Sequence, residues 1–319
     1  MVAIGLPGKR NPARDSSMSI LRIGKVAINV LDLAEARRHY GEFLGLTETA
    51  SAPGTAYFKG WDEYDHHSVI LKENDRAGLD HLAFKVRFPD DLARIESTCE
   101  QFGFPVQRVS AGSRIGEGEA VATTLPTGHR IEFYQQMERV GIAVGNTNPE
   151  PWPDDRRGVG VNRFDHVLLT GEDLEGVTRF FVEGLDFHQS ERLINKEGSL
   201  LASFLHVTNK AHDIAFIKGP NGKLHHVGFY VETWDDVLRA ADLQSRHRVR
   251  TELTPSRHGL TRGLTTYFFD PSGNRNETYA GGTFPHYDND VVTWTEDEAA
   301  RAIFFHGREM IPSFGSALT

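Results

Sequence analysis

The sequence predicts an α+β fold of four βαβββ modules, paired into two half-barrel domains. The chain repeats itself at an offset of about 145 residues: LDHLAFKV at 79–86 matches LHHVGFYV at 224–231, and LPTGHRIEFY at 125–134 matches DPSGNRNETY at 270–279. Each copy also contains the same unit two times: a strand, then an amphipathic helix, then further strands of alternating polarity. A repeat of this length is typical of duplicated domains rather than of a solenoid.

The first copy shows this alternation clearly. A strand that begins at Lys25 is followed by LAEARRHYGEFLGL (33–46), whose apolar residues recur at helical spacing, and later by the strand HSVILK (67–72). The strand LDHLAFKV then precedes a second helix pattern, PDDLARIESTCEQFGF (89–104). This order gives two βαβββ units.

The second copy repeats the same elements. HVLLTGEDLEGVTRFFVEGLDF (166–187) contains a strand and a helix, HDIAFIK (212–218) a later strand, and TWDDVLRAADL (233–243) the fourth helix. VGNTNPEPWPDDRRG, rich in Pro, Asn and Asp, separates the copies. We therefore expect a flexible extension, an N-terminal domain, a linker, a C-terminal domain and a tail, at 1–18, 19–145, 146–160, 161–290 and 291–319.

Composition excludes several classes of protein. The 319 residues carry a net charge of -9 and form no basic stripe, which argues against a nucleic-acid or anionic-membrane partner. No apolar run approaches the roughly 18 residues of a membrane helix, and no signal pattern opens the chain, so we expect a cytoplasmic protein. The single cysteine, Cys99, excludes an internal disulfide framework.

Three residues with metal-binding side chains fall at corresponding places in the second copy. His226 opens the strand that matches the one containing His81, and Glu277 follows His226 by 51 residues, as Glu132 follows His81. His166 opens the first strand of its own module, at the position equivalent to His226. Two imidazoles and one carboxylate on three strands around one cavity form the ligand set of a non-haem Fe(II) site.

The first copy provides an internal comparison. Lys25 stands where His166 stands in the second copy. A protonated lysine is a poor metal ligand, so we expect the N-terminal domain to hold no metal. His81 and Glu132 would then be remnants that can still hydrogen-bond each other.

His225 immediately precedes His226, and successive strand residues point to opposite faces. We therefore expect His225 to point away from the cavity. The alternative for the whole ligand set is that His166, His226 and Glu277 are separate buried polar residues, each satisfied by hydrogen bonds.

These features resemble the type I extradiol catechol 2,3-dioxygenases of the vicinal oxygen chelate superfamily. The resemblance runs from about Ile20 onward and is most specific in KLHHVGFYVETWDDVLRAADL, TPSRHGLTRGLTTYFFDPSGNRNETYAGG and AIFFHGREMIPSFGSALT. It implies the vicinal oxygen chelate (glyoxalase-like) fold, a homotetramer, and Fe(II) on His166, His226 and Glu277. Mn(II) is an alternative to Fe(II), because the same donors do not strongly separate the two metals. It also implies that O2 cleaves a catechol ring beside its hydroxyl groups, giving a 2-hydroxymuconic semialdehyde in aromatic-compound degradation.

The resemblance also implies roles for residues around the ligands. His212 would act as the acid–base group, which suits a side chain that titrates near neutral pH. Tyr267 and His258 would hydrogen-bond the catecholate oxygens. The tail would close the substrate pocket. The residues implied to line the ring pocket are Leu260, Thr261, Ile303, Phe314 and Phe204.

Two other functions remain open from the sequence. One is a different metal-dependent enzyme on this fold, such as a glyoxalase-like isomerase or a lyase; such enzymes generally use four protein ligands, and Lys25 argues against a site in the first half. The other is a non-enzymatic small-molecule binding protein, which needs no metal and has no reason to place His212 and Tyr267 beside the ligand set.

Overall fold

The computed structural model describes residues 19–319, so the expected flexible extension at 1–18 lies outside the described residues. The elements of the first half are β1 (Ile20–Val30), α1 (Leu33–Arg37), β2 (Thr47–Ala52), β3 (Thr55–Lys59), β4 (Val69–Glu73), β5 (Gly78–Val86), α2 (Pro89–Gln101), β6 (Val106–Val109), β7 (Ala120–Thr124) and β8 (Arg130–Tyr134). Those of the second half are β9 (Arg163–Gly171), α3 (Leu174–Arg179), β10 (His188–Ile194), β11 (Leu200–His206), β12 (Ile214–Lys218), β13 (Lys223–Tyr230), α4 (Trp234–Arg246), β14 (Thr251–Arg257), β15 (Gly263–Phe269), β16 (Arg275–Gly281), β17 (Val292–Thr295) and α5 (Ala299–Ile303).

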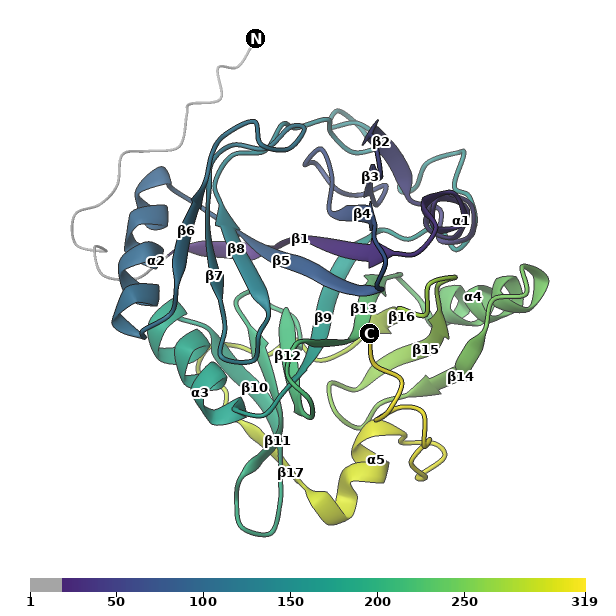
Figure 1. Cartoon of the computed structure of the whole chain (residues 1–319). Coiled ribbons are helices and arrows are strands. Elements are labelled where there is room, and N and C mark those ends of the chain that lie inside the picture. The colour runs from purple at the N-terminus through teal and green to yellow at the C-terminus, as the bar shows by residue number, and fades with distance from the viewer. Residues whose placement is uncertain (1–18) are drawn as a thin grey trace.

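Two mixed sheets, one from each half of the chain, form the molecule (Figure 1). Their strand orders are β2-β3-β4-β1-β5-β8-β7-β6 and β14-β15-β16-β13-β9-β12-β11-β10-β17. In every module the first strand pairs in parallel with the last, and the first strands of the two modules in one sheet pair antiparallel. This repeated arrangement confirms the predicted fold of four βαβββ modules. The domain boundaries drawn from the sequence remain predictions.

The helices follow the predicted patterns with one difference. Helix α4 begins after Thr233, whose hydroxyl accepts from the Asp236 backbone N–H while the Asp236 carboxylate accepts in return, forming a capping box. The helix expected at 33–46 is α-helical only over α1 and continues as a π-helix at Arg38–Phe43; α3 likewise continues as a π-helix at Phe180–Gly184. Apolar spacing did not reveal this change, because the wider turns still bury the same face of the segment.

One hydrophobic core joins the two halves. Phe84 on β5 packs against Phe181 and Phe187 of the second half, with ring centroids 6.1 and 5.2 Å away. Elsewhere, the Tyr40 hydroxyl donates to Asp270 at 3.0 Å. These contacts hold the second sheet against the first.

After β16, the chain adds an edge strand to the second sheet and then returns to the start of β13. Strand β17 pairs in parallel with β10, α5 follows, and Thr319 pairs with Leu224 through backbone hydrogen bonds of 2.8 and 3.2 Å. The last segment of the chain therefore lies beside the start of β13 (Figure 1). None of the helices in residues 19–319 is long and apolar enough to cross a membrane.

Candidate metal centre and its cavity

Three neighbouring strands of the second sheet bring His166, His226 and Glu277 together. Glu277 Oε2 lies 2.9 Å from His166 Nε2 and 3.2 Å from His226 Nε2, and all three side chains are buried. Within residues 19–319, no other group of three or more His, Cys, Asp or Glu side chains converges in this way. Two imidazole nitrogens and a carboxylate oxygen are suitable donors for a divalent transition metal.

Gly228 makes room for this arrangement. It lies on β13 opposite both His166 on β9 and Glu277 on β16. A Cβ added at Gly228 would lie 2.3 Å from the ring of His166, so any side chain there would displace the candidate ligand. The corresponding residue of the first sheet, opposite Lys25, is Ala83. Gly228 was not predicted from the sequence, although its alignment with Ala83 in the repeat is a usable signal.

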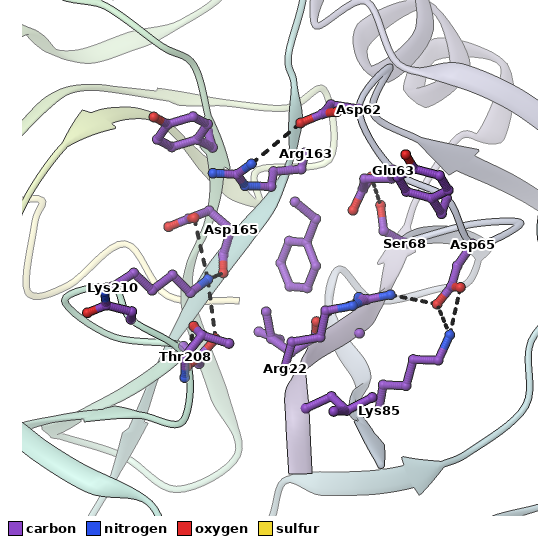
Figure 2. A pocket seen from close by; sticks show the side chains of 18 of the residues that line it. Arg22, Asp62, Glu63, Asp65, Ser68, Lys85, Arg163, Asp165, Thr208 and Lys210 are labelled. Carbon is purple, nitrogen blue, oxygen red and sulfur yellow. Dashed lines mark hydrogen bonds and ion pairs between the residues drawn. The ribbon is translucent and has the colours of Figure 1, made fainter. Parts of the chain in front are cut away.

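Asp165 orients His166 from the side away from the candidate metal position. The His166 Nδ1–H donates to Asp165 at 2.8 Å, which leaves Nε2 facing Glu277. Burial opposes a charge on His166, but its hydrogen bonds to Asp165 and Glu277 outweigh burial and raise its pKa to about 9, so a bound metal would displace a proton from Nε2. Lys210 donates to the Asp165 backbone carbonyl and lies 3.4 Å from its carboxylate (Figure 2). From the sequence, only the position of Asp165 directly before His166, in FDH (164–166), could have indicated this role. No sequence pattern indicated Lys210.

Asp165 and Lys210 also line a pocket of about 550 Å³ between the two halves (Figure 2). Its charged side chains are largely paired: Asp65 accepts from Arg22 and Lys85 at 2.6 and 2.7 Å. His212 lines both this pocket and the cavity around Glu277. This histidine therefore stands between the candidate metal centre and the interdomain pocket.

The position of His225 differs from the sequence expectation. It is buried, lines the same cavity as His226, and its Nδ1 lies 2.7 Å from His226 Nδ1. A register shift between Leu224 and His226 interrupts the pairing of β13 with β9. Because a bulge disrupts strict alternation, the expectation that His225 points away from the cavity is wrong.

His212 lies directly beside the converging ligands. Its ring centroid is 4.2 Å from that of His166, and neither ring nitrogen has a hydrogen-bond partner. Burial and the neighbouring His166 hold the pKa of His212 well below its usual value. The imidazole is thus neutral, and both of its nitrogens are available to a group placed in the cavity.

His258 and Tyr267 form a hydrogen-bonded pair beside Glu277. The His258 Nδ1–H donates to the Ile303 carbonyl, and Nε2 lies 3.0 Å from the Tyr267 hydroxyl. Burial and Glu277 raise the pKa of Tyr267 well above its usual value, which keeps the phenol protonated. The pair thus presents polar atoms beside the carboxylate without adding a negative charge.

The cavity that contains these groups has a volume of about 150 Å³. Every site residue proposed from the sequence lines it, and the remaining wall is apolar except for His225 and the Tyr279 hydroxyl. Its further members, which were not predicted from the sequence, are Leu168, Leu193, Leu201, Ala202, Ile217, Tyr279, Met310 and Gly315. No lysine or arginine of the described chain lines this cavity.

Ion pairs occupy the equivalent region of the first sheet. Lys25 is fully buried, and its Nζ lies 2.5 Å from Glu117 and 3.7 Å from Glu132. Arg114 donates two hydrogen bonds of 2.8 Å to Glu132. Burial would raise the pKa of Glu132, but His81, Arg114 and Lys25 together lower it to about 2. The sequence left open a hydrogen bond between His81 and Glu132, but the structure has none. His81 Nε2 lies 3.5 Å from Glu132 and has no hydrogen-bond partner.

Comparisons with known proteins agree with this architecture. Residues 163–278 match the family model described as Glyoxalase/Bleomycin resistance protein/Dioxygenase superfamily, and residues 79–138 match the catechol 2,3-dioxygenase-like N-terminal domain. A metapyrocatechase from Pseudomonas sp. (strain CF600) is 42% identical, over 94% of this chain and 99% of the relative. A manganese-dependent 2,3-dihydroxybiphenyl 1,2-dioxygenase from Geobacillus genomosp. 3 is 28% identical, over 92% of this chain and 96% of the relative.

Solved structures give the same picture. The 2,3-dioxygenase LapB from Pseudomonas sp. KL28 superposes with a TM-score of 0.86 at 40% identity, covering 88% of this chain and 99% of that one. Homoprotocatechuate 2,3-dioxygenase from Brevibacterium fuscum, in complex with 3,4-dihydroxyphenylacetate, superposes with a TM-score of 0.84 at 26% identity, covering 93% and 92%. The chain belongs to the metapyrocatechase (catechol 2,3-dioxygenase) family of extradiol ring-cleaving dioxygenases.

Proposed function

We propose that this protein uses O2 to cleave single-ring catechols beside their two hydroxyl groups, with Fe(II) held by His166, His226 and Glu277. The observation that carries the proposal is the convergence of these three donors at the wall of a 150 Å³ apolar cavity. The products are 2-hydroxymuconic semialdehydes. Neither an isomerase nor a metal-independent binding protein accounts for the donor set together with family membership.

The donor set fits a divalent metal because each histidine has its other nitrogen engaged. His166 donates from Nδ1 to Asp165, and His226 Nδ1 faces His225, so both Nε2 atoms are directed to Glu277. When bound, Fe(II) supplies open coordination positions for the catechol and O2 and passes electron density between them. Mn(II) is the alternative for the same donors, and one relative is named as manganese-dependent.

The protein's own residues then position the catechol and move its protons. His212, neutral and unpartnered, accepts a catechol hydroxyl proton and later returns it to oxygen. Tyr267 and His258, which also line the cavity, hydrogen-bond the catechol oxygens. Leu260, Thr261, Ile303, Phe314 and Phe204 hold the ring and exclude water.

Cavity size and charge define the substrate class. An apolar cavity of roughly 150 Å³ holds one benzene ring, so this cavity accepts one ring and small apolar substituents. A second ring would have to extend beyond this volume, and a carboxylated side chain finds no cation in the wall. We therefore expect catechol and methylcatechols to be preferred over 2,3-dihydroxybiphenyl and 3,4-dihydroxyphenylacetate.

The test is O2 uptake after anaerobic reconstitution with Fe(II) or Mn(II), recorded with the absorbance of the yellow product. Glu277→Ala should lose both metal and activity, because one of three donors is removed. His212→Phe should keep the metal and lose about 10²- to 10⁴-fold in turnover, the usual contribution of an acid–base group. His67→Phe, at the equivalent position of the first sheet, is the matched control and should turn over as the wild type does.

Full activity in Glu277→Ala would exclude the ligand assignment, and no O2 uptake with any single-ring catechol despite bound metal would exclude the reaction. We also propose, from the family resemblance, a homotetramer in the cytoplasm. Light scattering on the purified protein measures the assembly.

A further inference from the structure

The last segment of the chain reaches the candidate metal centre through one histidine. The His225 Nε2–H donates to the Phe314 carbonyl at 2.8 Å, and the two rings lie 4.6 Å apart. Arg275 donates to the carbonyls of His225 and Ser313, which holds the last segment of the chain against the start of β13. Phe314 also lines the substrate cavity.

These hydrogen bonds determine which nitrogen of each histidine carries a proton. A carbonyl only accepts, so His225 Nε2 must be protonated. Two protonated Nδ1 atoms cannot face each other at 2.7 Å, so one Nδ1 of His225 and His226 must be an acceptor. If His225 donated there, a neutral His226 would carry its proton on Nε2 and could not bind a metal through that atom. Only the opposite arrangement, with His226 Nδ1–H donating to His225, leaves a lone pair on His226 Nε2.

We propose that His225 is a positioning residue that couples the closing segment, residues 310–319, to metal binding. When the segment lies over the cavity, the Phe314 carbonyl holds the His225 proton on Nε2, and His225 in turn holds the His226 proton on Nδ1. When the segment leaves, His225 can adopt the other tautomer and direct a proton onto His226 Nε2. The inference rests on the proposed function, because it takes His226 as a metal ligand.

The first sheet shows how the two contacts of His225 can be separated. Asp80 occupies the position equivalent to His225, and its carboxylate accepts from His81 Nδ1 at 2.6 Å. A short side chain with an oxygen at the δ position is therefore sufficient to orient the following histidine. His225→Asn should keep the contact with His226 but cannot reach Phe314, whereas His225→Leu loses both contacts.

The experiment measures Mn(II) affinity and the mobility of the closing segment in the full chain. Free Mn(II) is counted by its electron paramagnetic resonance signal. Amide hydrogen exchange is followed in the peptide that contains the closing segment, where the Thr319 and Ala317 amides donate to backbone carbonyls at 3.2 and 2.8 Å. Both measurements are made with and without Mn(II), because coupling between two sites must be reciprocal.

In the wild type, Mn(II) should slow exchange of the closing segment. His225→Leu should bind Mn(II) about 10- to 100-fold more weakly, the usual effect of losing a residue that orients a metal ligand. His225→Asn should stay within about tenfold of wild-type affinity, the equivalent of one neutral hydrogen bond. Its closing segment should exchange faster, and Mn(II) should no longer slow that exchange. Asp80→Asn is the matched control and should change neither quantity.

Two results would overturn the proposal alone: wild-type Mn(II) affinity in His225→Leu, or Mn(II)-dependent slowing that persists in both His225 variants. Glu277→Ala separates these results from a failure of the proposed function. If Glu277→Ala binds Mn(II) as tightly as the wild type, the ligand assignment is wrong and the proposal falls with it. Circular dichroism of each variant without metal establishes that it is folded.

Discussion

Replacing Lys25 with methionine removes the buried positive charge that stands in place of a ligand in the first sheet. Lys25 is fully buried, and its Nζ contacts Glu117 at 2.5 Å and Glu132 at 3.7 Å. Removing one partner of a buried ion pair costs about 3–5 kcal/mol. Because Arg114 still contacts both carboxylates, at 3.0 and 2.8 Å, we expect the lower end, about 3 kcal/mol.

Urea unfolding at pH 7, followed by circular dichroism, measures this loss. The double variant Lys25→Met/Glu117→Gln removes the charge on both partners and should recover most of the stability. Burial raises the pKa of Glu117, but the hydrogen bond from His67, together with Lys25 and Arg114, holds that pKa well below its usual value. Stability from such a carboxylate is present above its unfolded pKa and is lost as pH falls. The difference in the free energy of unfolding between the wild type and Lys25→Met should therefore become smaller below about pH 4.3.

Two results would contradict this prediction. One is a free energy of unfolding for Lys25→Met within about 0.5 kcal/mol of the wild-type value. The other is a double variant that is no more stable than Lys25→Met. Lys72→Met is a control, since Lys72 pairs with Asp80 in a partly exposed position. Its loss should stay under about 1 kcal/mol. Mn(II) affinity should be unchanged in both lysine variants, because neither residue lies at the candidate metal centre.

Two further predictions concern buried histidines. Burial lowers the pKa of His39 to about 4, against its hydrogen bond to Asn276. The unfolded chain takes up a proton on this histidine at about pH 6.5, whereas the folded protein does so only near pH 4. The free energy of unfolding is therefore unaffected by His39 above about pH 6.5 and falls by about 3 kcal/mol as the pH drops from there to 4. His39→Gln should flatten that part of a stability–pH curve measured by urea unfolding; an unchanged slope would contradict it. Asp165→Asn should weaken Mn(II) binding about 10- to 100-fold by loosening His166, whereas Asp62→Asn in the interdomain pocket should not, and equal affinities in the two variants would refute this role.

The sequence by itself determined the fold and the members of the candidate ligand set. The periods of strands and helices are local properties that can be read from the sequence. The 145-residue repeat showed that the two modules of the second copy follow the same order of elements as those of the first. The same repeat aligned His226 with His81 and identified Lys25 as the residue that replaces His166. The family resemblance then added His212, His258 and Tyr267, all of which line the observed cavity.

Only the tertiary structure decided how these residues are oriented. A bulge in β13 placed His225 against His226, where strand alternation predicted the opposite face. Its partner, the Phe314 carbonyl, lies 89 residues away in the sequence. Likewise, the role of Gly228 depends on the ring of a residue in the neighbouring strand. Such contacts join segments far apart in the chain, and no local pattern of residue types records which of them meet.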